Sequence, residues 1–225
     1  MRIITPPTNL EAAVYMLVGL IIGVIFHEYM HGYVAYRMGD TTAKQAGRLT
    51  LDPLAHVDPF GTLILPGFLF LLRLLGQGTF IIGYAKPVPV NPFYFKKPRG
   101  IIWVSIAGPL TNLAIAIVFM GLLKVFTLPQ PGTLTSRLIN TCDQIAYINI
   151  LLFVFNLIPI PPLDGSRIVS YFLKGNAKRS YQSLEPYGFM IVFVLVMIFG
   201  VALSGPVGEL RNIILRVFGI KVIFL

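Results

Sequence analysis

The chain has 225 residues, of which 56% are hydrophobic and only 12% are charged, and its formal net charge is +9. A soluble domain carries about 25% charged residues, so this chain has too few charges to cover a water-exposed surface. We therefore expect an integral membrane protein, built as a single domain over residues 1–225. The basic residues stand in short groups between apolar runs and form no continuous stripe, so nucleic acid is excluded as a partner. In a membrane protein, basic loops report orientation instead.

The first apolar run covers residues 10–36, and a spanning helix needs about 20 apolar residues. Only one basic residue, Arg2, precedes the run, and no small-residue cleavage site follows it. We therefore expect a retained helix and not a signal peptide. Cys142 is the only cysteine, which excludes an internal disulfide and a CxxC metal site.

The rest of the chain alternates between apolar runs and polar, turn-rich connections such as residues 37–61. The short apolar stretch 62–75 contains Pro66-Gly67 and fits a short span, a re-entrant hairpin or an interfacial segment. Residues 76–100 alternate in polarity and carry several prolines, which indicates a strand or an extended edge. Further spans are expected at residues 101–125, 142–158 and 187–204, followed by an interfacial helix or short last span at 206–225.

These runs predict an all-α polytopic membrane protein with about four to six transmembrane helices. A small membrane-associated β or extended element would accompany the helices. The core is expected over about residues 10–170, and C-terminal helices over 187–225.

His27-Glu28-Tyr29-Met30-His31 is an HExxH sequence inside the first expected span. Residues four apart lie on one face of a helix, so the two imidazoles can share a metal ion. Glu28 points about 100° away, beside the metal, where its carboxylate can accept a proton from bound water. Ionisable side chains are costly inside a membrane and are usually functional there. The alternative, two hydrogen-bonded helix histidines without a metal, would leave Glu28 as a buried carboxyl group with no evident partner.

A catalytic zinc ion needs a third protein ligand, and the sequence narrows the choice. Another glutamate is an unlikely source, because the next one after Glu28 is Glu185. The remaining candidates are Asp164, His56, Asp52 and Asp58. Asp164 follows a spanning helix within a PPLDG segment, whose prolines break helical hydrogen bonding and can let a short carboxylate turn inward. It can equally be a turn residue of an Asp-Gly pair.

Two separated motifs resemble those of the site-2 protease family of intramembrane zinc metalloproteases. The first is HEYMH at 27–31, and the second is the run NLIPIPPLDG at 156–165, an NxxPxxxxDG-type segment near the end of a later helix. Gly108-Pro109 with Asn112, and the stretch GYAKPVPVNP at 83–92, are similar to the compact bacterial and archaeal branch. The resemblance covers about residues 10–170, and the chain has no room for the PDZ insertion or the CBS pair of other branches.

The resemblance implies a zinc-dependent endopeptidase that cleaves a transmembrane segment of a membrane-bound substrate. It also implies one Zn²⁺ per chain, held by His27, His31 and Asp164, with Glu28 as the general base.

Three other polar residues are weaker candidates for the site. Asn156 and Asn112 would position the substrate backbone or stabilise the oxyanion, or else they form interhelical hydrogen bonds. His56 is either a loop residue bonded to Asp58 or a group beside the zinc that gates substrate entry.

Two further classes of function fit the composition. A membrane metal transporter could line an ion path with the same side chains, but it does not explain a glutamate directly after the first histidine of a helical pair. A non-catalytic membrane adaptor would not need an intact HExxH.

The basic residues predict how the chain sits in the cell membrane. Of the 18 basic residues, 11 fall in segments 37–61, 76–100 and 165–186, which are the connections expected on the active-site side. Basic loops stay in the cytoplasm, so the metal site of this multi-pass protein is expected nearer the cytoplasmic face.

Overall fold

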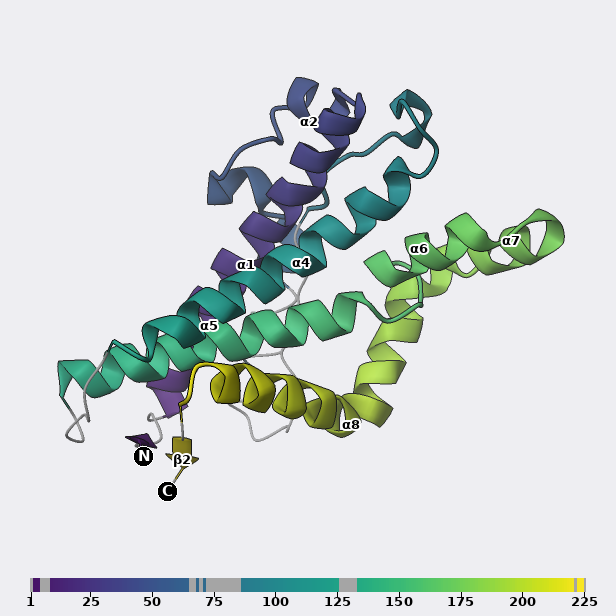
Figure 1. The fold of residues 1–225 in the computed structure, drawn as a ribbon. Coiled ribbons are helices and arrows are strands. Elements are labelled where there is room, and N and C mark those ends of the chain that lie inside the picture. Colours follow the sequence, from purple (N-terminus) through teal and green to yellow (C-terminus); the bar gives the residue numbers. More distant parts are fainter. Residues whose placement is uncertain are drawn as a thin grey trace.

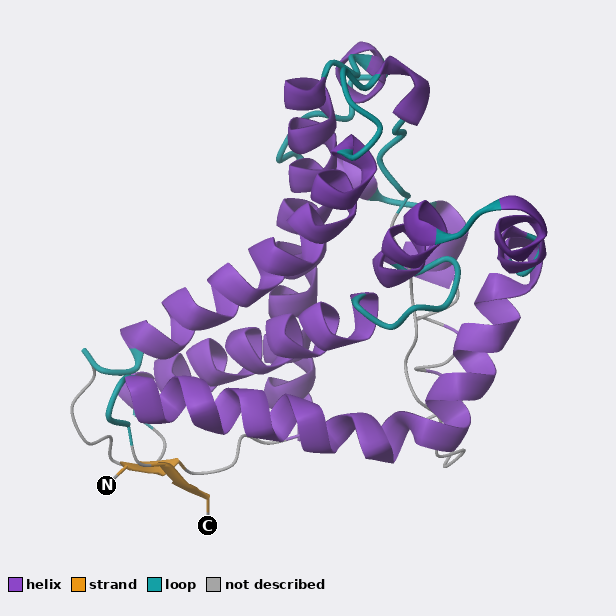
Figure 2. Ribbon diagram, turned by 45° about the vertical axis from the view of Figure 1, so that its right-hand side comes forward, coloured by secondary structure: helices purple, strands orange, loops and turns teal. Residues whose placement is uncertain are grey.

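The computed structural model describes residues 2–4, 9–64, 68, 71, 86–125, 133–220 and 222–224. Helices dominate this part of the chain (Figures 1 and 2). The long helices are α1 (Asn9–Met38), α4 (Gly100–Leu122), α5 (Leu134–Asn156) and α8 (Gly188–Val217). The short ones are α2 (Thr42–Gln45), α6 (Asp164–Phe172) and α7 (Gly175–Gln182). Single helical turns lie at Pro53–His56, Pro59–Ile64, Pro92–Tyr94 and Glu185–Tyr187.

Two short strands join the ends of the chain. β1 (Arg2–Ile4) pairs in parallel with β2 (Val222–Phe224), with Arg2 opposite Val222. Both termini therefore lie side by side, at the end of the molecule away from α2 (Figure 1).

Helices α1, α4 and α5 form the central bundle, and small residues let them approach closely. Gly19 and Gly23 of α1 face α5, where an added Cβ at Gly19 would lie 3.0 Å from the Cα of Ile145. Such a small-xxx-small pattern is common where membrane helices meet. α1 runs parallel to α5, because Gly19 and Gly23 lie against Ile145 and Asn149 in turn. α4 runs antiparallel to α1, which brings the C-terminal half of α1 against the N-terminal half of α4.

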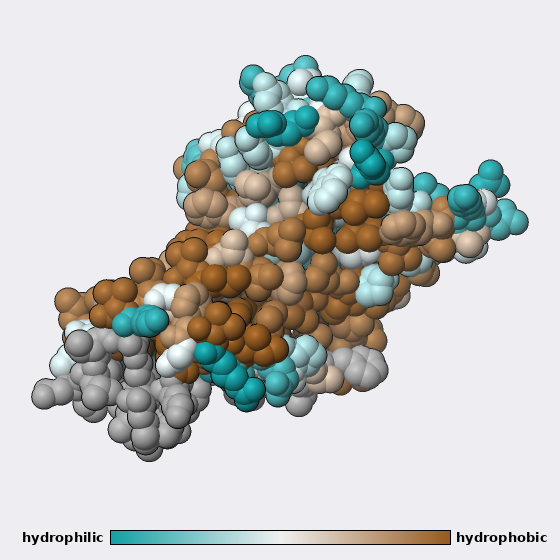
Figure 3. Space-filling model, in the orientation of Figure 1, coloured by the Kyte–Doolittle hydropathy of each residue, from teal (hydrophilic) through white to brown (hydrophobic). Residues whose placement is uncertain are grey.

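Three helices of the described part of the chain are long and apolar enough to cross a bilayer, namely α1, α4 and α5. Hydrophobic residues cover the middle of the face in Figure 3, while hydrophilic residues gather at the end near α2 and at the tip formed by α7. This distribution suits a protein that sits in a membrane. The expected total of four to six spans stays a prediction.

Helix α5 begins eight residues before the expected span at 142–158. Its first turns carry polar residues that look like a loop in the sequence, but two of them, Ser136 and Asn140, are buried. The hydroxyl of Thr133 accepts a hydrogen bond from the backbone N–H of Ser136 at 3.3 Å and so caps the helix. Capping and burial therefore extend the helix beyond its apolar stretch.

The expected segment 187–204 and the first part of the segment 206–225 form one continuous helix, α8 (Gly188–Val217), with Pro206 inside it. The separation predicted between them is wrong, because a proline can be tolerated within a helix as a kink. Figure 1 shows α8 running away from α7 and then turning sharply to lie along α5. Its second half covers α4 and α5 with Val207, Ile214 and Leu215, which join Met120, Ile139 and Ile150 in the main hydrophobic core.

The connections on either side of residues 65–85 lie at the same end of the bundle. The backbone N–H of Lys96 donates to the carbonyl of Met38 at 2.9 Å, and the N–H of Asn91 donates to Asp40 Oδ2 at 2.6 Å. Residues 86–91 belong to no helix or strand, and the backbone of Asn91 is extended. Most of the stretch 62–75, and residues 76–85 of the expected extended edge, lie outside the described residues.

Candidate active site

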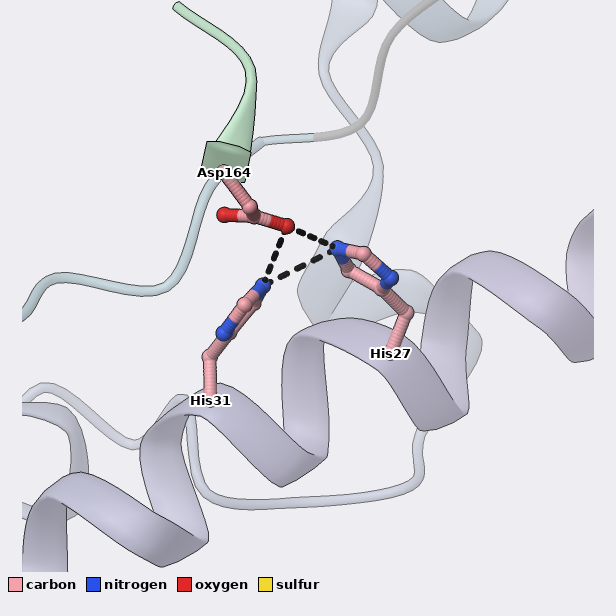
Figure 4. Close-up of side chains that lie close together, drawn as sticks. All are labelled: His27, His31 and Asp164. Carbon is pink, nitrogen blue, oxygen red and sulfur yellow. Dashed lines mark hydrogen bonds and ion pairs between the residues drawn. The ribbon is translucent and has the colours of Figure 1, made fainter. Parts of the chain in front are cut away.

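Three buried side chains converge from two helices at the level where α1 meets α6 (Figure 4). The Nε2 atoms of His27 and His31 are 2.9 Å apart, and each lies 3.1 Å from Oδ2 of Asp164. The two histidines point from one face of α1, as their spacing predicts, while Asp164 is the first residue of α6. All three residues are less than 10% exposed. The structure therefore brings together the two predicted histidines and one of four candidate third ligands.

The chain after α5 is shaped to deliver Asp164 to this point. α5 ends at Asn156, and three prolines lie in the connection that follows, at positions 159, 161 and 162. The first turn of α6 then packs tightly against the end of α5. A Cβ at Gly165 would lie 2.3 Å from the carbonyl oxygen of Leu157, so only glycine fits there.

Hydrogen bonds on the far side of each imidazole fix its tautomer. The Nδ1 atom of His31 lies 2.7 Å from the carbonyl oxygen of Val104, which can only accept, so Nδ1 carries the proton. His27 Nδ1 lies 2.6 Å from Asn112 Oδ1, while the amide nitrogen of Asn112 donates to Gly23 and Asn149. His27 is therefore protonated at Nδ1 as well. In their neutral forms, both rings turn Nε2 lone pairs toward each other and toward a carboxylate.

This arrangement of donors fits a zinc ion. Two lone pairs and a carboxylate oxygen repel one another unless a cation lies between them. Zinc–nitrogen distances of about 2.0–2.1 Å place two ligands of a tetrahedral ion about 3.3 Å apart. The observed separations of 2.9 and 3.1 Å are close to that value. Metal-bound histidines also usually donate their other ring N–H to a carbonyl or amide oxygen, as these two do.

Asp164 is suited to be the anionic ligand. Burial alone would raise the pKa of its carboxyl group, but attraction and hydrogen bonds from His31 and His27, when these rings carry a proton at Nε2, hold that pKa below its usual range. The carboxylate is thus ionised throughout the neutral pH range and can balance part of the charge of a divalent cation.

The backbone of α4 lies directly against the two imidazoles. A Cβ at Gly108 would come within 2.5 Å of His31 Nε2 and 2.7 Å of His27 Nε2. Glycine at this position therefore lets α4 support the rings without a side chain between them.

Glu28 lies beside the three candidate ligands and lines the same cavity, whose volume is about 110 Å³. Its Oε2 atom accepts a hydrogen bond of 2.8 Å from the backbone N–H of Val88. The segment at 86–91 therefore holds the carboxylate in place. A cavity of this size has room for an ion and a few water molecules, because each water occupies about 30 Å³.

The weaker candidates fall in different places. Asn156 lines the cavity, and its amide nitrogen donates to Leu152 of its own helix at 3.0 Å. Asn112 is fully buried behind the His27 ring and links three helices, so it supports a histidine and does not line the cavity. Asn112 therefore forms interhelical hydrogen bonds, which is the second of the two roles expected for it.

The other three candidate ligands, His56, Asp52 and Asp58, form hydrogen bonds away from the metal cavity. His56 Nε2 lies 2.9 Å from the Thr50 carbonyl, and its Nδ1 has no partner within the described part of the chain. Asp52 accepts the N–H of Leu54 at 3.0 Å, and Asp58 accepts those of Phe60 and Gly61. These aspartates cap local turns, which is a common use of short carboxylates.

Sequence reasoning missed the supporting groups around the site. The carbonyl of Val104 and the N–H of Val88 are backbone atoms, so no residue type marks them in the sequence. Asn149 could have been predicted from the sequence as a hydrogen-bonding residue, because a polar amide in an apolar helix usually has a partner on a neighbouring helix. The sequence marks Gly108 only as part of the Gly108-Pro109 motif. Its contact with the histidines follows from the packing of α4 on α1.

Comparison with known proteins identifies the family of the chain. The model of peptidase family M50 matches residues 15–133 and 123–199. YwhC of Bacillus subtilis is 39% identical over 186 residues, which cover 80% of this chain and 79% of YwhC. Rip2 of Mycolicibacterium smegmatis is 29% identical over 86% of this chain and 71% of its own length. A relative in Methanocaldococcus jannaschii is 31% identical, with 74% of each chain covered.

All three relatives bear names that class them provisionally as zinc metalloproteases. No solved structure matches the chain. The family model covers most of the chain, and the HExxH helix and the Asp164 segment both lie within the matched residues. The chain therefore belongs to peptidase family M50, the site-2 proteases.

Proposed function

We propose that this protein is a zinc-dependent intramembrane endopeptidase that cleaves a transmembrane segment of a membrane-bound substrate. The observation that supports this most directly is the convergence of His27, His31 and Asp164 next to Glu28. The histidines and the glutamate lie on α1, which is one of three helices apolar enough to cross a bilayer. A peptidase site on such a helix can reach peptide bonds within or close to the membrane.

The residues of the chain divide the chemistry between them. His27, His31 and Asp164 would hold one Zn²⁺, which when bound acidifies a water molecule and polarises the peptide carbonyl. Glu28 accepts a proton from that water as its oxygen attacks the carbonyl carbon. When the carbon–nitrogen bond breaks, Glu28 returns the proton to the leaving amine. Before substrate binds, the Val88 N–H holds Oε2 of Glu28 in position.

The substrate must unwind before it can be cut, because a transmembrane helix hides its peptide bonds in its own hydrogen bonds. The segment at 86–91, whose Pro87 and Val88 line the metal cavity, could bind the opened strand by β-augmentation. Its own prolines at positions 87 and 89 cannot donate, and the N–H groups of Lys86 and Val88 already bond to His56 and Glu28. Pairing through the N–H of Val88 would therefore require it to exchange Glu28 for a substrate carbonyl.

Replacing Glu28 by glutamine tests the proposal. The amide keeps the size of the side chain but cannot accept a proton, so Glu28→Gln should retain about one zinc per chain and lose cleavage. Comparing membrane proteomes of cells with either form should reveal a membrane protein that accumulates in the variant. Glu11→Gln is the matched control, because Glu11 lies on the same helix, 3.3 Å from Arg137, and should keep full activity.

The same comparison separates the competing functions. An adaptor would be indifferent to Glu28→Gln. A metal transporter would show altered metal flux without any accumulating substrate. Zinc at full occupancy in a His27→Ala, His31→Ala double variant would contradict the proposed metal site.

A further inference from the structure

A second and larger cavity lies next to the candidate metal site. Its volume is about 730 Å³, and it runs between the connection 90–101, the loop before α6, and the helices α6 and α7. Both cavities are lined by Pro162 and Arg167. The larger cavity, which we call the α6–α7 groove, is therefore adjacent to the position where a peptide bond would be cut.

The walls of the α6–α7 groove are suited to an extended peptide. Its volume is within the range of about 300–1,000 Å³ that is usual for ligand pockets. Aromatic and proline residues form much of the lining, including Phe93, which is 96% exposed, and Tyr181, whose hydroxyl donates to the Pro159 carbonyl at 2.7 Å. Exposed aromatic side chains at a cavity mouth commonly act as contact points for a partner chain.

The charges of the groove favour an acidic partner. Arg167 and Lys178 both line it, and within the described residues neither takes part in an ion pair. Glu185 is the only acidic residue among the lining residues, so the lining carries a net charge of +1 from two cations and one anion. The adjacent Lys174 and Arg179 add to the positive potential of α7. Like-charged substrates would be repelled from such a surface.

The position of the groove identifies which part of a substrate would reach it. α7 has no buried residues and is polar along its length, so it lies outside the hydrocarbon layer. The groove lies at the same end of the bundle as the metal site and shares Pro162 and Arg167 with it. A substrate strand that passes the metal site and leaves the membrane on this side would enter the groove.

We propose that the α6–α7 groove binds the acidic, extended segment of the substrate that lies just outside the membrane, next to the peptide bond that is cut. Arg167 and Lys178 pair with carboxylates of that segment, and Phe93 contacts its apolar side chains. The groove thus sets substrate specificity through charge. This inference rests on the proposed proteolytic function.

The test uses the full-length protein in phosphatidylcholine vesicles, which contain no anionic headgroups that could occupy the groove. The probes are three fluorescent single-span peptides with one apolar segment and a central Gly-Pro pair. They differ only in four residues that follow the segment on the metal-site side, which are aspartate, asparagine or lysine. Cleavage is measured with the unaltered protein, and binding is measured by anisotropy with Glu28→Gln.

We expect the aspartate peptide to be cut with a kcat/KM about tenfold above that of the lysine peptide, with the asparagine peptide between them. Lys178→Glu should reduce this ratio to about one, and Lys178→Gln should give an intermediate ratio. Arg179→Glu makes the same charge change on the same helix, but its side chain does not line the groove, so it should lower the ratio distinctly less than Lys178→Glu does. Equal zinc content in all variants shows that each is folded.

Equal cleavage of the three peptides would overturn the groove proposal and leave the proteolytic function intact. So would an equal response to Lys178→Glu and Arg179→Glu, because that would indicate a general field and not a binding site. If no peptide is cut but the aspartate peptide binds in a Lys178-dependent way, the proposed function fails and the groove proposal stands. Absence of both cleavage and binding would overturn both.

Discussion

Asp164 supplies the negative charge that two neutral imidazoles lack, and this makes it the most sensitive ligand of the proposed site. Asp164→Asn keeps the shape of the side chain but removes the charge that balances a divalent cation. We expect zinc affinity to fall by at least about 100-fold and cleavage to be nearly lost. Metal analysis of the purified protein and a cleavage assay in vesicles measure the two effects.

His56 provides the comparison for this variant. Its Nε2 bonds to the Thr50 carbonyl and it does not line the metal cavity, so His56→Ala should keep its zinc. If Asp164→Asn stays active while His56→Ala is inactive and free of zinc, then His56 is the third ligand.

Asn112 acts on the metal site through His27. Its Oδ1 accepts the N–H of that ring at 2.6 Å, so it fixes the tautomer that leaves Nε2 free to bind metal. Asn112→Ala should lower zinc affinity by about 10- to 100-fold, which is the usual effect of removing such a partner. Competition with a chelator measures this change.

Asn149→Ala is the matched control, because Asn149 bonds to Asn112 but does not touch the ring. Its loss should weaken zinc binding distinctly less. Equal effects of the two substitutions would show that the polar network supports helix packing and not the histidine itself.

At the scale of single helices, the sequence predicts some features correctly and leaves others hidden. Helix α1 could be predicted with its histidines on one face, because apolar length and i, i+4 spacing are local properties. The start of α5 could not, because its polar residues Ser136 and Asn140 are hidden by neighbouring helices. Asp164 was one of four candidates by local sequence, since only the packing of α6 against α5 brings it to the histidines.

Close packing of α4 on α1 gives a prediction for Gly108. An added methyl group would lie within 2.5 Å of His31 Nε2, so the ring or the helix must move. A displacement of about 1 Å in catalytic geometry can cost about 100-fold in rate, so Gly108→Ala should lose cleavage to that extent and bind zinc poorly. Metal content and cleavage are measured together.

Gly208→Ala controls for the general effect of alanine in a helix. A Cβ at Gly208 of α8 meets no atom within 4 Å, and alanine stabilises a helix interior by about 0.5–1 kcal/mol relative to glycine. This variant should keep full zinc and activity. An active, zinc-loaded Gly108→Ala protein would show that α4 does not press against the histidines as closely as described.

At the scale of the whole molecule, three basic connections gather at one end of the bundle. The connection after α1 is hydrogen-bonded to the connection before α4 through Met38 and Lys96. The connection before α4 also lines the α6–α7 groove, together with helices α6 and α7. These connections carry 11 of the 18 basic residues when taken as segments 37–61, 76–100 and 165–186. The metal site lies nearer this end, since it is formed by the C-terminal half of α1 and the start of α6.

The positive-inside rule turns this asymmetry into a prediction of orientation, with the basic end and the metal site on the cytoplasmic side. Cysteine labelling in sealed cells tests it, after Cys142 is replaced by alanine. A cysteine at the exposed Lys97 should be protected from a membrane-impermeant reagent and should react once the cells are opened. A cysteine at Leu134, which is 73% exposed at the start of α5 and so at the opposite end of the bundle, should react from outside. The reverse pattern would place the proposed protease site on the outer face, where it would meet a different set of substrate segments.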